Sequence, residues 1–350
     1  MGTYYDGYGN MTTLADGTYY DGNGNKIIVL TNQDNMMSWS GMTDTFKENV
    51  DTAMAYIDSY LSENENAYAI SQLNDIHNTF SGNEPNYIDY HDSIGYSRML
   101  ILGDIVNVYD EKQYNDAISY MEGAYKSNRI ICMGNHEYGG YEDGDTLPIE
   151  WYRPLIDESC VWWNGDDSAL TYYSDDDENN VRYMVTDSLH VTRVSAGVQQ
   201  ISLEQIQWMA SVMQSAGDKD IIIATHTPLG GFYLTTDDNK ETKKITTTVT
   251  NNGTVTSVIN AFQNRTSVTV NGTTYDFSPC TGKFIMYATG HWHESGYGDE
   301  LGYNTFTGSC ILQSGEPGMS FYIIDRTQEK IIWLVCRKTE NTPSIYEYAY

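Results

Sequence analysis

The spacing of apolar residues along the chain predicts helices that alternate with buried strands. Phe46, Val50, Met54, Ile57 and Leu61 recur at helical spacing and predict an amphipathic helix that begins after about residue 41. Five apolar runs that finish in polar residues predict strands, at 67–77, 98–106, 129–137, 220–226 and 283–291. Because helical stretches fall between several of these strands, the pattern favours an α/β architecture.

Two further elements carry local signals. Ser202 with Gln205 matches a capping box, and Ile201 with Ile206 matches a hydrophobic staple, so a helix is predicted over 202–214. Near the end of the chain, FYIIDRTQEKIIWLVC predicts a hairpin, and with it an antiparallel element in the core.

The remaining segments predict an appendage and two insertions. GTYYDGYGN at 2–10 returns as GTYYDGNGN at 17–25, with DG and GN turn signals that suit either a small β-hairpin array or a flexible leader. We expect residues 1–40 to be an appendage, with a surface or glycan contact as one hypothesis, and residues 41–350 to form the main domain. Segments 139–180 and 230–280 have the polar, Gly-rich composition of insertions, and the second has a hairpin signal at 271–272.

Composition and charge narrow the class of protein. Hydrophobic residues make up 40% of the 350 residues, which allows a substantial core and disfavours wholesale disorder. No apolar run approaches the roughly 18 residues of a membrane helix. The first residues, MGTYYDGYGN, lack the regions of a signal peptide, so we expect a cytoplasmic protein or, for a mature fragment, an extracellular or virion-associated one. The net charge of −29 disfavours loose binding to long nucleic acids or anionic lipid.

The candidate chemistry lies where the predicted strands end. The five runs finish in Asp75-Ile76-His77, Gly103-Asp104, Gly134-Asn135-His136, His226 and Gly290-His291-Trp292-His293. Ligands gather beyond the carboxyl ends of strands in open α/β sheets, so these motifs are expected to converge. Residues i and i+2 of an extended segment point to one side, which lets Asp75 with His77, and His291 with His293, each present two ligands.

The donor types indicate a transition-metal site. Five of the seven histidines of the chain lie in these motifs, and His91 and His190 fall outside them as expected surface or structural residues. Carboxylate, imidazole and amide oxygen donors together suit Mn, Fe, Zn, Co or Ni better than Ca or Mg alone.

The ordered set NDIH, GDIVN, GNHE, THTPL and GHWH resembles the calcineurin-like metallophosphoesterase family, over roughly residues 65–325. The resemblance implies a four-layer α-β-β-α sandwich of two mixed β-sheets flanked by helices. It implies two divalent transition-metal ions, with segments 139–180 and 230–280 bordering the mouth of the site. Many members have Asp where Asn107 stands, a position beside the metals rather than on them, so substrate contacts there are in doubt.

The resemblance also implies a role for each motif residue. Asp75, His77 and His293 would bind the first metal, and Asp104 would bridge both metals. Asn135, His226 and His291 would complete the second site. His136 would be the unligated general acid or a stabiliser of the transition state, and Asn107 and Glu137 would lie behind the ligands or touch substrate.

The implied activity is hydrolysis of a phosphomonoester or phosphodiester by a metal-bridging hydroxide. Two alternatives stay open: a metal-dependent nuclease, and a non-catalytic surface or virion protein that retains the fold. Other polar features have structural interpretations. We expect the acidic run Asp175–Asp177 to be a solvated loop rather than a calcium site. A solvated face is expected for Lys240, Lys243 and Lys244, against a role in substrate approach. Buried free thiols are expected for Cys132 and Cys336.

Overall fold

The computed structural model describes most of the chain. The described residues are 2–5, 11–14, 17–20, 26–29, 44–77, 97–106, 115, 129–138, 152–165, 169–189, 199–230, 232–234, 243–245, 249–309 and 318–350. None of the helices within these ranges has both the length and the hydropathy that a membrane crossing requires.

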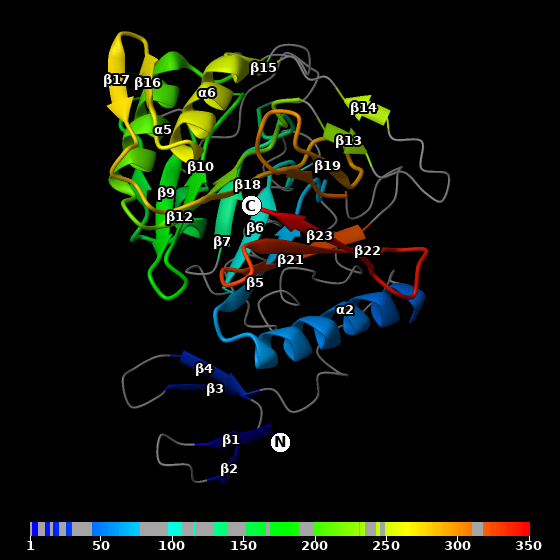
Figure 1. The fold of residues 1–350 in the computed structure, drawn as a ribbon. Helices are drawn as coiled ribbons and strands as arrows, with labels where there is room; N and C mark the ends of the chain where they lie inside the picture. Colours follow the sequence, from blue (N-terminus) through cyan, green and yellow to red (C-terminus); the bar gives the residue numbers. More distant parts are fainter. Residues whose placement is uncertain are drawn as a thin grey trace.

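One large sheet has six strands and mixed directions (Figure 1). Its order is β23 (Ser344–Ala349), β22 (Lys330–Arg337), β21 (Gly318–Asp325), β5 (Ala67–Leu73), β6 (Arg98–Leu102) and β7 (Arg129–Cys132). Strands β5, β6 and β7 are parallel, whereas β21, β22 and β23 add antiparallel neighbours. The antiparallel pairing of β21 with β22 confirms the hairpin predicted near the end of the chain.

The second large sheet has nine described strands and is also mixed. Its order is β14 (Lys243–Ile245), β13 (Phe232–Leu234), β19 (Gly296–Gly298), β20 (Thr305–Thr307), β18 (Phe284–Thr289), β12 (Asp220–Ala224), β10 (Val181–Val185), β9 (Tyr172–Asp176) and β8 (Val161–Trp162). The central strands β10, β12, β18 and β20 are parallel. Parallel strands buried on both faces read as continuous apolar runs, as IIIA of β12 does.

The two sheets pack face to face between outer helices. Helix α2 (Asp44–Glu63) covers the six-stranded sheet, and α5 (Leu203–Ser215) and α6 (Asn252–Gln263) cover the nine-stranded sheet (Figure 1). The alternation of side chains along β12 explains why this sheet is covered on both faces. Ile222 faces the core shared with the other sheet, whereas Ile221 and Ile223 face α5 and α6. This arrangement confirms the predicted four-layer sandwich.

Aromatic residues fill the space between the sheets. The ring of Phe306, from the nine-stranded sheet, lies 5.3 Å from the rings of both Tyr322 and Trp333 in the six-stranded sheet, measured between centroids. All three side chains are fully buried. Burial of such large apolar surfaces is the main force that holds the two sheets together.

The local helix signals are confirmed with one change. Helix α2 buries Phe46, Val50 and Ile57, as the helical spacing predicts. At the start of α5, the Ser202 hydroxyl accepts a hydrogen bond from the Gln205 main chain at 3.1 Å. The reciprocal half of the capping box is replaced, because the Gln205 side chain donates to the Thr171 hydroxyl at 2.6 Å instead.

Several smaller elements complete the described chain. The N-terminal repeat forms two hairpins: β1 (Gly2–Tyr5) pairs with β2 (Met11–Leu14), and β3 (Gly17–Tyr20) pairs with β4 (Lys26–Val29). Each GTYY copy supplies the first strand of one hairpin. The signal at 271–272 corresponds to the turn between β16 (Ser267–Val270) and β17 (Thr273–Asp276). The remaining described elements are β11 (Gln199–Gln200), β15 (Val249–Thr250) and a 3-10 turn at Arg153–Leu155.

Both segments predicted as insertions contribute to the core where they are described. Helix α6 buries Val255, Val258 and Phe262 against the nine-stranded sheet. Tyr172 of β9 is fully buried, and its hydroxyl donates to the Ile131 carbonyl at 3.0 Å. These parts of the two segments therefore belong to the layers of the fold.

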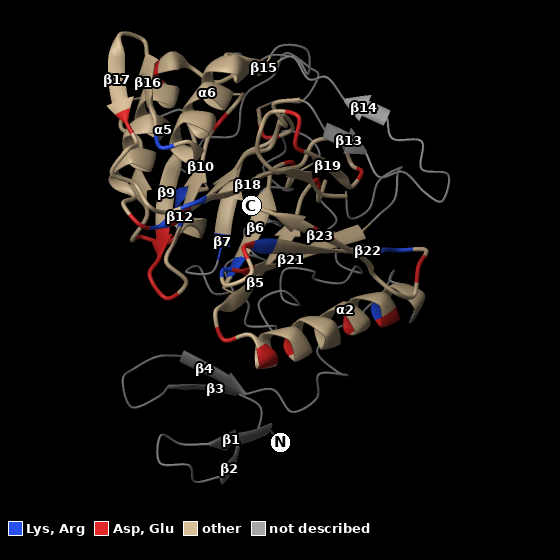
Figure 2. Ribbon diagram, viewed as in Figure 1, with Lys and Arg blue, Asp and Glu red and all other residues tan. Residues whose placement is uncertain are grey.

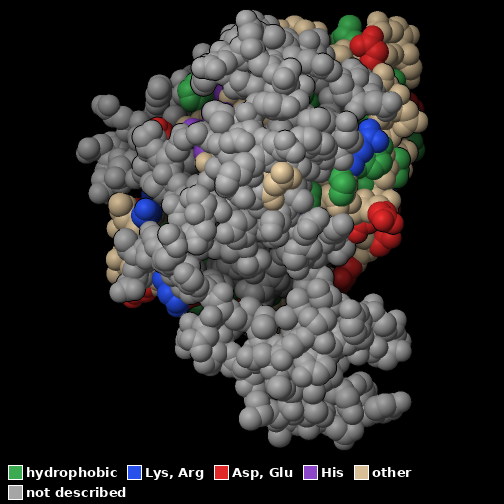
Figure 3. Space-filling view, turned by 180° about the vertical axis from the view of Figure 1, so that it is seen from behind, with side chains coloured by type: hydrophobic (Ala, Val, Ile, Leu, Met, Phe, Trp, Pro, Cys, Tyr) green, Lys and Arg blue, Asp and Glu red, His purple; other side chains and the backbone are tan. Residues whose placement is uncertain are grey.

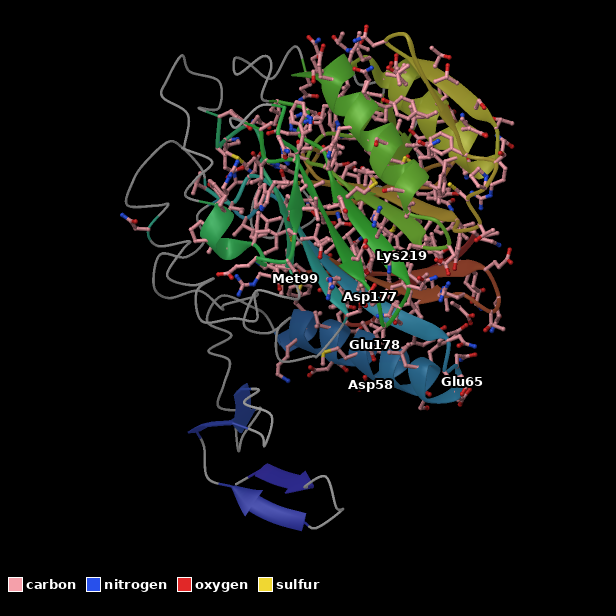
Figure 4. All side chains as sticks on the ribbon, turned by 90° about the vertical axis from the view of Figure 1, so that its left-hand side faces the viewer. Asp58, Glu65, Met99, Asp177, Glu178 and Lys219 are labelled. Atoms are coloured by element: carbon pink, nitrogen blue, oxygen red, sulfur yellow. The ribbon has the colours of Figure 1, made fainter. Side chains whose placement is uncertain are left out.

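The acidic run at 175–177 is part of a strand and its turn. Asp175 pairs with Arg182 at 2.7 Å, and Asp176 accepts from the Ser97 hydroxyl at 2.5 Å. Asp177 pairs with Lys219 at 2.5 Å, and both residues are labelled in Figure 4. Figure 2 shows acidic and basic residues side by side around β9 and β12. The expectation of a solvated loop is wrong for Asp175 and Asp176, which lie in β9. Each carboxylate has a protein partner, which favours a structural role for the run over calcium binding.

The structure describes the cysteines and some of the other polar residues singled out in the sequence. Cys132 and Cys336 are buried and free, as expected, and so are Cys160 and Cys280 among the described cysteines. Lys243 and Lys244 lie in β14. Lys240, His91, His190 and Asn107 lie outside the described residues.

Candidate metal centre

All five sequence motifs lie at the carboxyl ends of parallel strands. The motifs that contain Asp75, Asp104 and Asn135 follow β5, β6 and β7, which are neighbours in the six-stranded sheet. His226 and His291 follow β12 and β18, which are neighbours in the nine-stranded sheet. Because the two sheets pack face to face, both sets of strand ends meet at one edge of the sandwich.

The first cluster of donor atoms contains Asp75, His77, Asp104 and His293, each with one ligand atom within 4.8 Å of the others. Nε2 of His77 lies 3.0 Å from Nε2 of His293. Oδ1 of Asp75 lies 3.3 Å from the same His293 nitrogen. The two carboxylates are buried, and the His293 side chain keeps 24% of its surface exposed.

The second cluster contains Asp104, His226 and His291, so Asp104 belongs to both clusters. Nε2 of His226 lies 3.3 Å from Oδ2 of Asp104 and 3.1 Å from Nδ1 of His291. Asn135 joins this cluster, because its Oδ1 lies 3.1 Å from the His226 nitrogen and 2.9 Å from the His291 nitrogen.

These donor atoms fit two cations. Nitrogen and oxygen ligands bind a transition metal at about 2.0–2.2 Å, so neighbouring ligands around one ion lie about 3 Å apart. The contacts of 2.9–3.3 Å within each cluster match that separation. The mixed carboxylate, imidazole and amide chemistry suits a first-row transition metal, and the spacing alone does not select which one.

Five of the residues in these clusters have an uncommon backbone conformation. Asp75, His77, Asp104, His291 and His293 have φ values of 52°, 50°, 50°, 75° and 59°. This left-handed region is sparsely populated by residues other than glycine and is typical of functional sites. The donor atoms of these five residues nevertheless converge in the two clusters.

Glu137 holds together the loops that follow β6 and β7. Its buried carboxylate accepts main-chain hydrogen bonds from Asp104 at 2.9 Å, Ile105 at 2.7 Å, Val106 at 3.0 Å and Gly134 at 2.6 Å. The loops approach so closely that a Cβ on Gly134 would lie 2.1 Å from Oδ1 of Asp104. Burial, together with the charge of Asp104, raises the pKa of Glu137 to about 7.

His136 lies beside the shared carboxylate. Its main-chain amide donates to Oδ1 of Asp104 at 2.8 Å, and its Nε2 lies 3.9 Å from Oδ2 of the same residue. Its side chain is 18% exposed. Histidine atoms are visible at the surface in Figure 3, and every described histidine of the chain belongs to this centre.

The electrostatics of the site favour a positive charge between its acidic groups. Burial lowers the pKa of His77 and His291 to about 4, so both imidazoles are neutral at pH 7, the state in which histidine binds metals. Burial alone would lower the pKa of His226, but Asp104 raises it to about 10. Burial opposes ionisation of Asp75 and Asp104, yet the neighbouring histidines lower the pKa of both carboxyl groups.

The structure adds contacts behind the ligands that the motifs did not reveal. Nδ1 of His226 lies 2.7 Å from the Leu102 carbonyl, which leaves Nε2 facing the second cluster. Nε2 of His291 lies 3.4 Å from the side-chain amide of Gln199. Asn74, directly before Asp75, donates to its Oδ2 at 2.6 Å. Its place in the NDIH motif, directly before a proposed ligand, is the sequence signal that could have identified Asn74.

The fold and the site define a phosphoesterase of the kind that uses metal ions. The sequence model of the calcineurin-like phosphoesterase family matches residues 68–294, and this chain belongs to that family. No curated protein matches the chain.

Two solved structures can be compared with this chain at low sequence identity. A dimetal phosphatase from Danio rerio is 12% identical, with a TM-score of 0.50 over 81% of this chain and 99% of its own. A predicted phosphoesterase from Streptococcus pneumoniae is 9% identical, with a TM-score of 0.32 over 81% of this chain and 98% of its own. The first likeness supports the fold.

Proposed function

We propose that this chain hydrolyses a phosphomonoester or phosphodiester at a site for two divalent transition-metal ions. The observation that carries the proposal is the convergence of seven side chains from five strand ends. They form two clusters that share Asp104. A carboxylate shared by two sets of donors would suit a pair of ions held side by side, which could polarise the phosphate group together.

The proposed ligands follow the two clusters. We assign Asp75, His77 and His293 to the first ion and Asp104 to both. The ligands assigned to the second ion are Asn135, His226 and His291. The donor separations of 2.9–3.3 Å support this division.

The charge balance of the ligand set suits an anionic substrate. When bound, the two ions would polarise the phosphate and make a water more acidic. Asp75 and Asp104 bring only two negative charges to balance two divalent ions, and the other proposed ligands would bind as neutral donors, His226 after an ion displaces its proton. The centre would therefore keep a net positive charge that attracts a phosphate group, within a chain whose net charge is −29.

His136 is the proposed acid of the reaction. Its imidazole is partly exposed, lies beside Asp104 and is in neither cluster, which supports a role next to the proposed ligands rather than among them. From there it could donate a proton to the leaving oxygen of the ester or stabilise charge in the transition state. Its main-chain bond to Asp104 holds the backbone of His136 beside the shared carboxylate, which supports this role.

A small or surface-presented phosphate ester is the proposed substrate. The net charge of −29 opposes loose binding of long nucleic acids, because a polyanion would be repelled beyond the metal centre itself. A short ester needs to enter only the positively charged centre.

The proposal is tested by turnover and metal content. We expect hydrolysis of p-nitrophenyl phosphate or of its bis-ester with added Mn²⁺, and loss of hydrolysis with EDTA. His136→Ala should abolish hydrolysis while about two ions per chain remain bound. Equal rates for this variant and the wild type would sink the assignment of the acid, and absence of bound metal in the wild type would sink the whole proposal.

We also propose that the chain divides near residue 40 into an appendage and the main domain. The N-terminal repeat supports this division, since each of its copies pairs within its own hairpin. A truncated chain of residues 41–350 should fold and keep the wild-type rate on p-nitrophenyl phosphate. A truncated chain that is insoluble or inactive would contradict the division.

A further inference from the structure

Two buried amide side chains at the end of β5 lie behind the first cluster: Gln72 within the strand and Asn74 directly after it. Gln72 and Asn74 are each 1% exposed and, being two residues apart on an extended segment, point to the same side. Gln72 accepts a hydrogen bond from the Tyr322 hydroxyl at 2.7 Å and donates to the Thr289 carbonyl at 2.8 Å. It also donates to Oδ1 of Asn74 at 3.0 Å. Burying polar groups costs free energy unless they are hydrogen-bonded, and both of these amides are hydrogen-bonded.

Asn74 connects this pair to the metal centre. Its side-chain nitrogen donates to Oδ2 of Asp75 at 2.6 Å. The same nitrogen lies 3.0 Å from the Gly308 carbonyl and 3.1 Å from the Ser309 carbonyl, which follow β20 of the other sheet. One amide thus joins a proposed ligand of the six-stranded sheet to the main chain of the nine-stranded sheet.

The two oxygens of Asp75 have different surroundings as a result. Oδ2 accepts from the Asn74 side chain and from the His291 main-chain amide, the latter at 3.0 Å. Oδ1 faces the first cluster, 3.3 Å from Nε2 of His293. These contacts fix the rotation of the carboxylate and set its position relative to the His291–His293 turn.

The packing of Gly308 is a second observation that points to the same pair. A Cβ at this position would lie 2.3 Å from Oδ1 of Asn74 and 2.4 Å from Nε2 of Gln72. Contacts that short do not occur, so the strand end after β20 can approach the two amides only with glycine there. Glycine at position 308 therefore permits the contact between the two amides and the nine-stranded sheet.

We propose that Gln72 and Asn74 are positioning residues for the first cation: Asn74 locks Asp75 through Oδ2, and Gln72 holds Asn74 in place. This inference rests on the proposed function, because it assumes that Asp75 and His293 bind a cation. Groups that orient a metal ligand from behind typically contribute 10- to 100-fold to metal affinity. The expected loss on removing Asn74 is therefore about 10- to 100-fold in the affinity of one of the two cations.

The test compares Asn74→Leu, which keeps the branched shape of the side chain but is apolar, with the wild type and with Gln205→Leu. Gln205 is also a buried glutamine, but its amide donates to Thr171, away from the proposed ligands. Metal-free full-length proteins are titrated with Mn²⁺ by calorimetry, and their unfolding temperatures are measured without metal. We expect both variants to melt earlier than the wild type, while only Asn74→Leu loses Mn²⁺ affinity.

The outcomes separate this inference from the proposed function. If the wild type binds Mn²⁺ and Asn74→Leu binds both ions within twofold of it, the positioning role is refuted and the metal site stands. If Gln205→Leu loses as much affinity as Asn74→Leu, the effect is general destabilisation and the role is also refuted. If the wild type binds no Mn²⁺, both proposals fall together.

A second variant tests the same proposal if Asn74→Leu does not fold. Should Asn74→Leu not fold, Gln72→Met removes the support of Asn74 and leaves Asn74 itself in place. We expect its affinity for one Mn²⁺ to fall by about tenfold, the lower end of the range for such groups. Unchanged affinity for both ions in this variant would overturn the proposal.

Discussion

Oδ1 of Asn135 lies 3.1 Å from Nε2 of His226, although 91 residues separate them along the chain. Asn135 follows β7 of the six-stranded sheet, whereas His226 follows β12 of the nine-stranded sheet. The second cluster is thus assembled across the boundary between the sheets. Cation binding and the packing of the two sheets should therefore stabilise each other.

Removal of the cations should lower the stability of the fold. A ligand at 100 times its dissociation constant stabilises the native state by about 2.7 kcal/mol. We expect EDTA to lower the unfolding temperature by a few degrees and added Mn²⁺ to restore it, as measured by scanning calorimetry. Identical unfolding temperatures with and without EDTA would contradict the assembly of the site from both sheets.

Asp104→Asn should have the largest effect of any single ligand change, because Asp104 belongs to both clusters. We expect loss of both cations and a fall in hydrolysis of more than about 100-fold, beyond what groups behind a ligand contribute. Metal analysis and steady-state kinetics measure this. The matched control is Asp177→Asn, a change to an exposed carboxylate paired with Lys219, which should keep the wild-type metal content and rate.

Gln199→Leu should weaken the second cation site. The Gln199 amide lies 3.4 Å from Nε2 of His291, while Nδ1 of His291 faces the cluster. Losing a group that orients the imidazole should reduce the affinity of one Mn²⁺ by about tenfold, measured by calorimetric titration. Gln207→Leu, which alters a glutamine bound to the Val270 carbonyl, is the control, and an equal loss in both variants would refute this role.

Asp176→Asn should remove an acid-sensitive part of the stability. Burial would raise the pKa of Asp176, but hydrogen bonds from Ser97 and Asn179 outweigh it and lower the pKa below its ordinary value of 3.8. A lowered folded-state pKa stabilises the protein above the ordinary value, and this contribution is lost as pH falls through the lowered one.

In urea unfolding at pH 7, Asp176→Asn should therefore cost about 1.5–3 kcal/mol, the range for hydrogen bonds to a charged group. The difference from wild type should shrink below about pH 4, where the wild-type carboxylate also becomes protonated. A difference that stays constant from pH 7 to pH 3 would contradict the charge-based explanation.

His293→Gly should be more stable than His293→Ala. His293 has φ of 59°, a region where alanine is strained and glycine is not. Relief of that strain should favour the glycine variant by about 1 kcal/mol, less the extra entropy of glycine in the unfolded chain. Urea unfolding of the two metal-free variants measures the difference, and a more stable alanine variant would refute strain at this residue.

The sequence was sufficient to predict the residues that meet at the site, because strand ends such as those at Asp75 and Asp104 carry both an apolar run and a chemical motif. It was less informative about residues behind the ligands. The contacts that suggest roles for Gln72 and Gln199 involve partners far along the chain, which the order of residues does not reveal. Helix α6 was likewise hidden, since Val255, Ile259 and Phe262 lie in a stretch rich in Thr and Asn.

The left-handed backbone at five cluster residues lowers the stability of the fold at the positions that carry the proposed ligands. Replacing such a residue by glycine would relax the backbone and remove a donor atom at once. Selection for thermal stability alone would therefore favour substitutions at these residues and would yield a stable protein without activity. Engineering of a more stable variant should measure turnover together with the unfolding temperature from the first round.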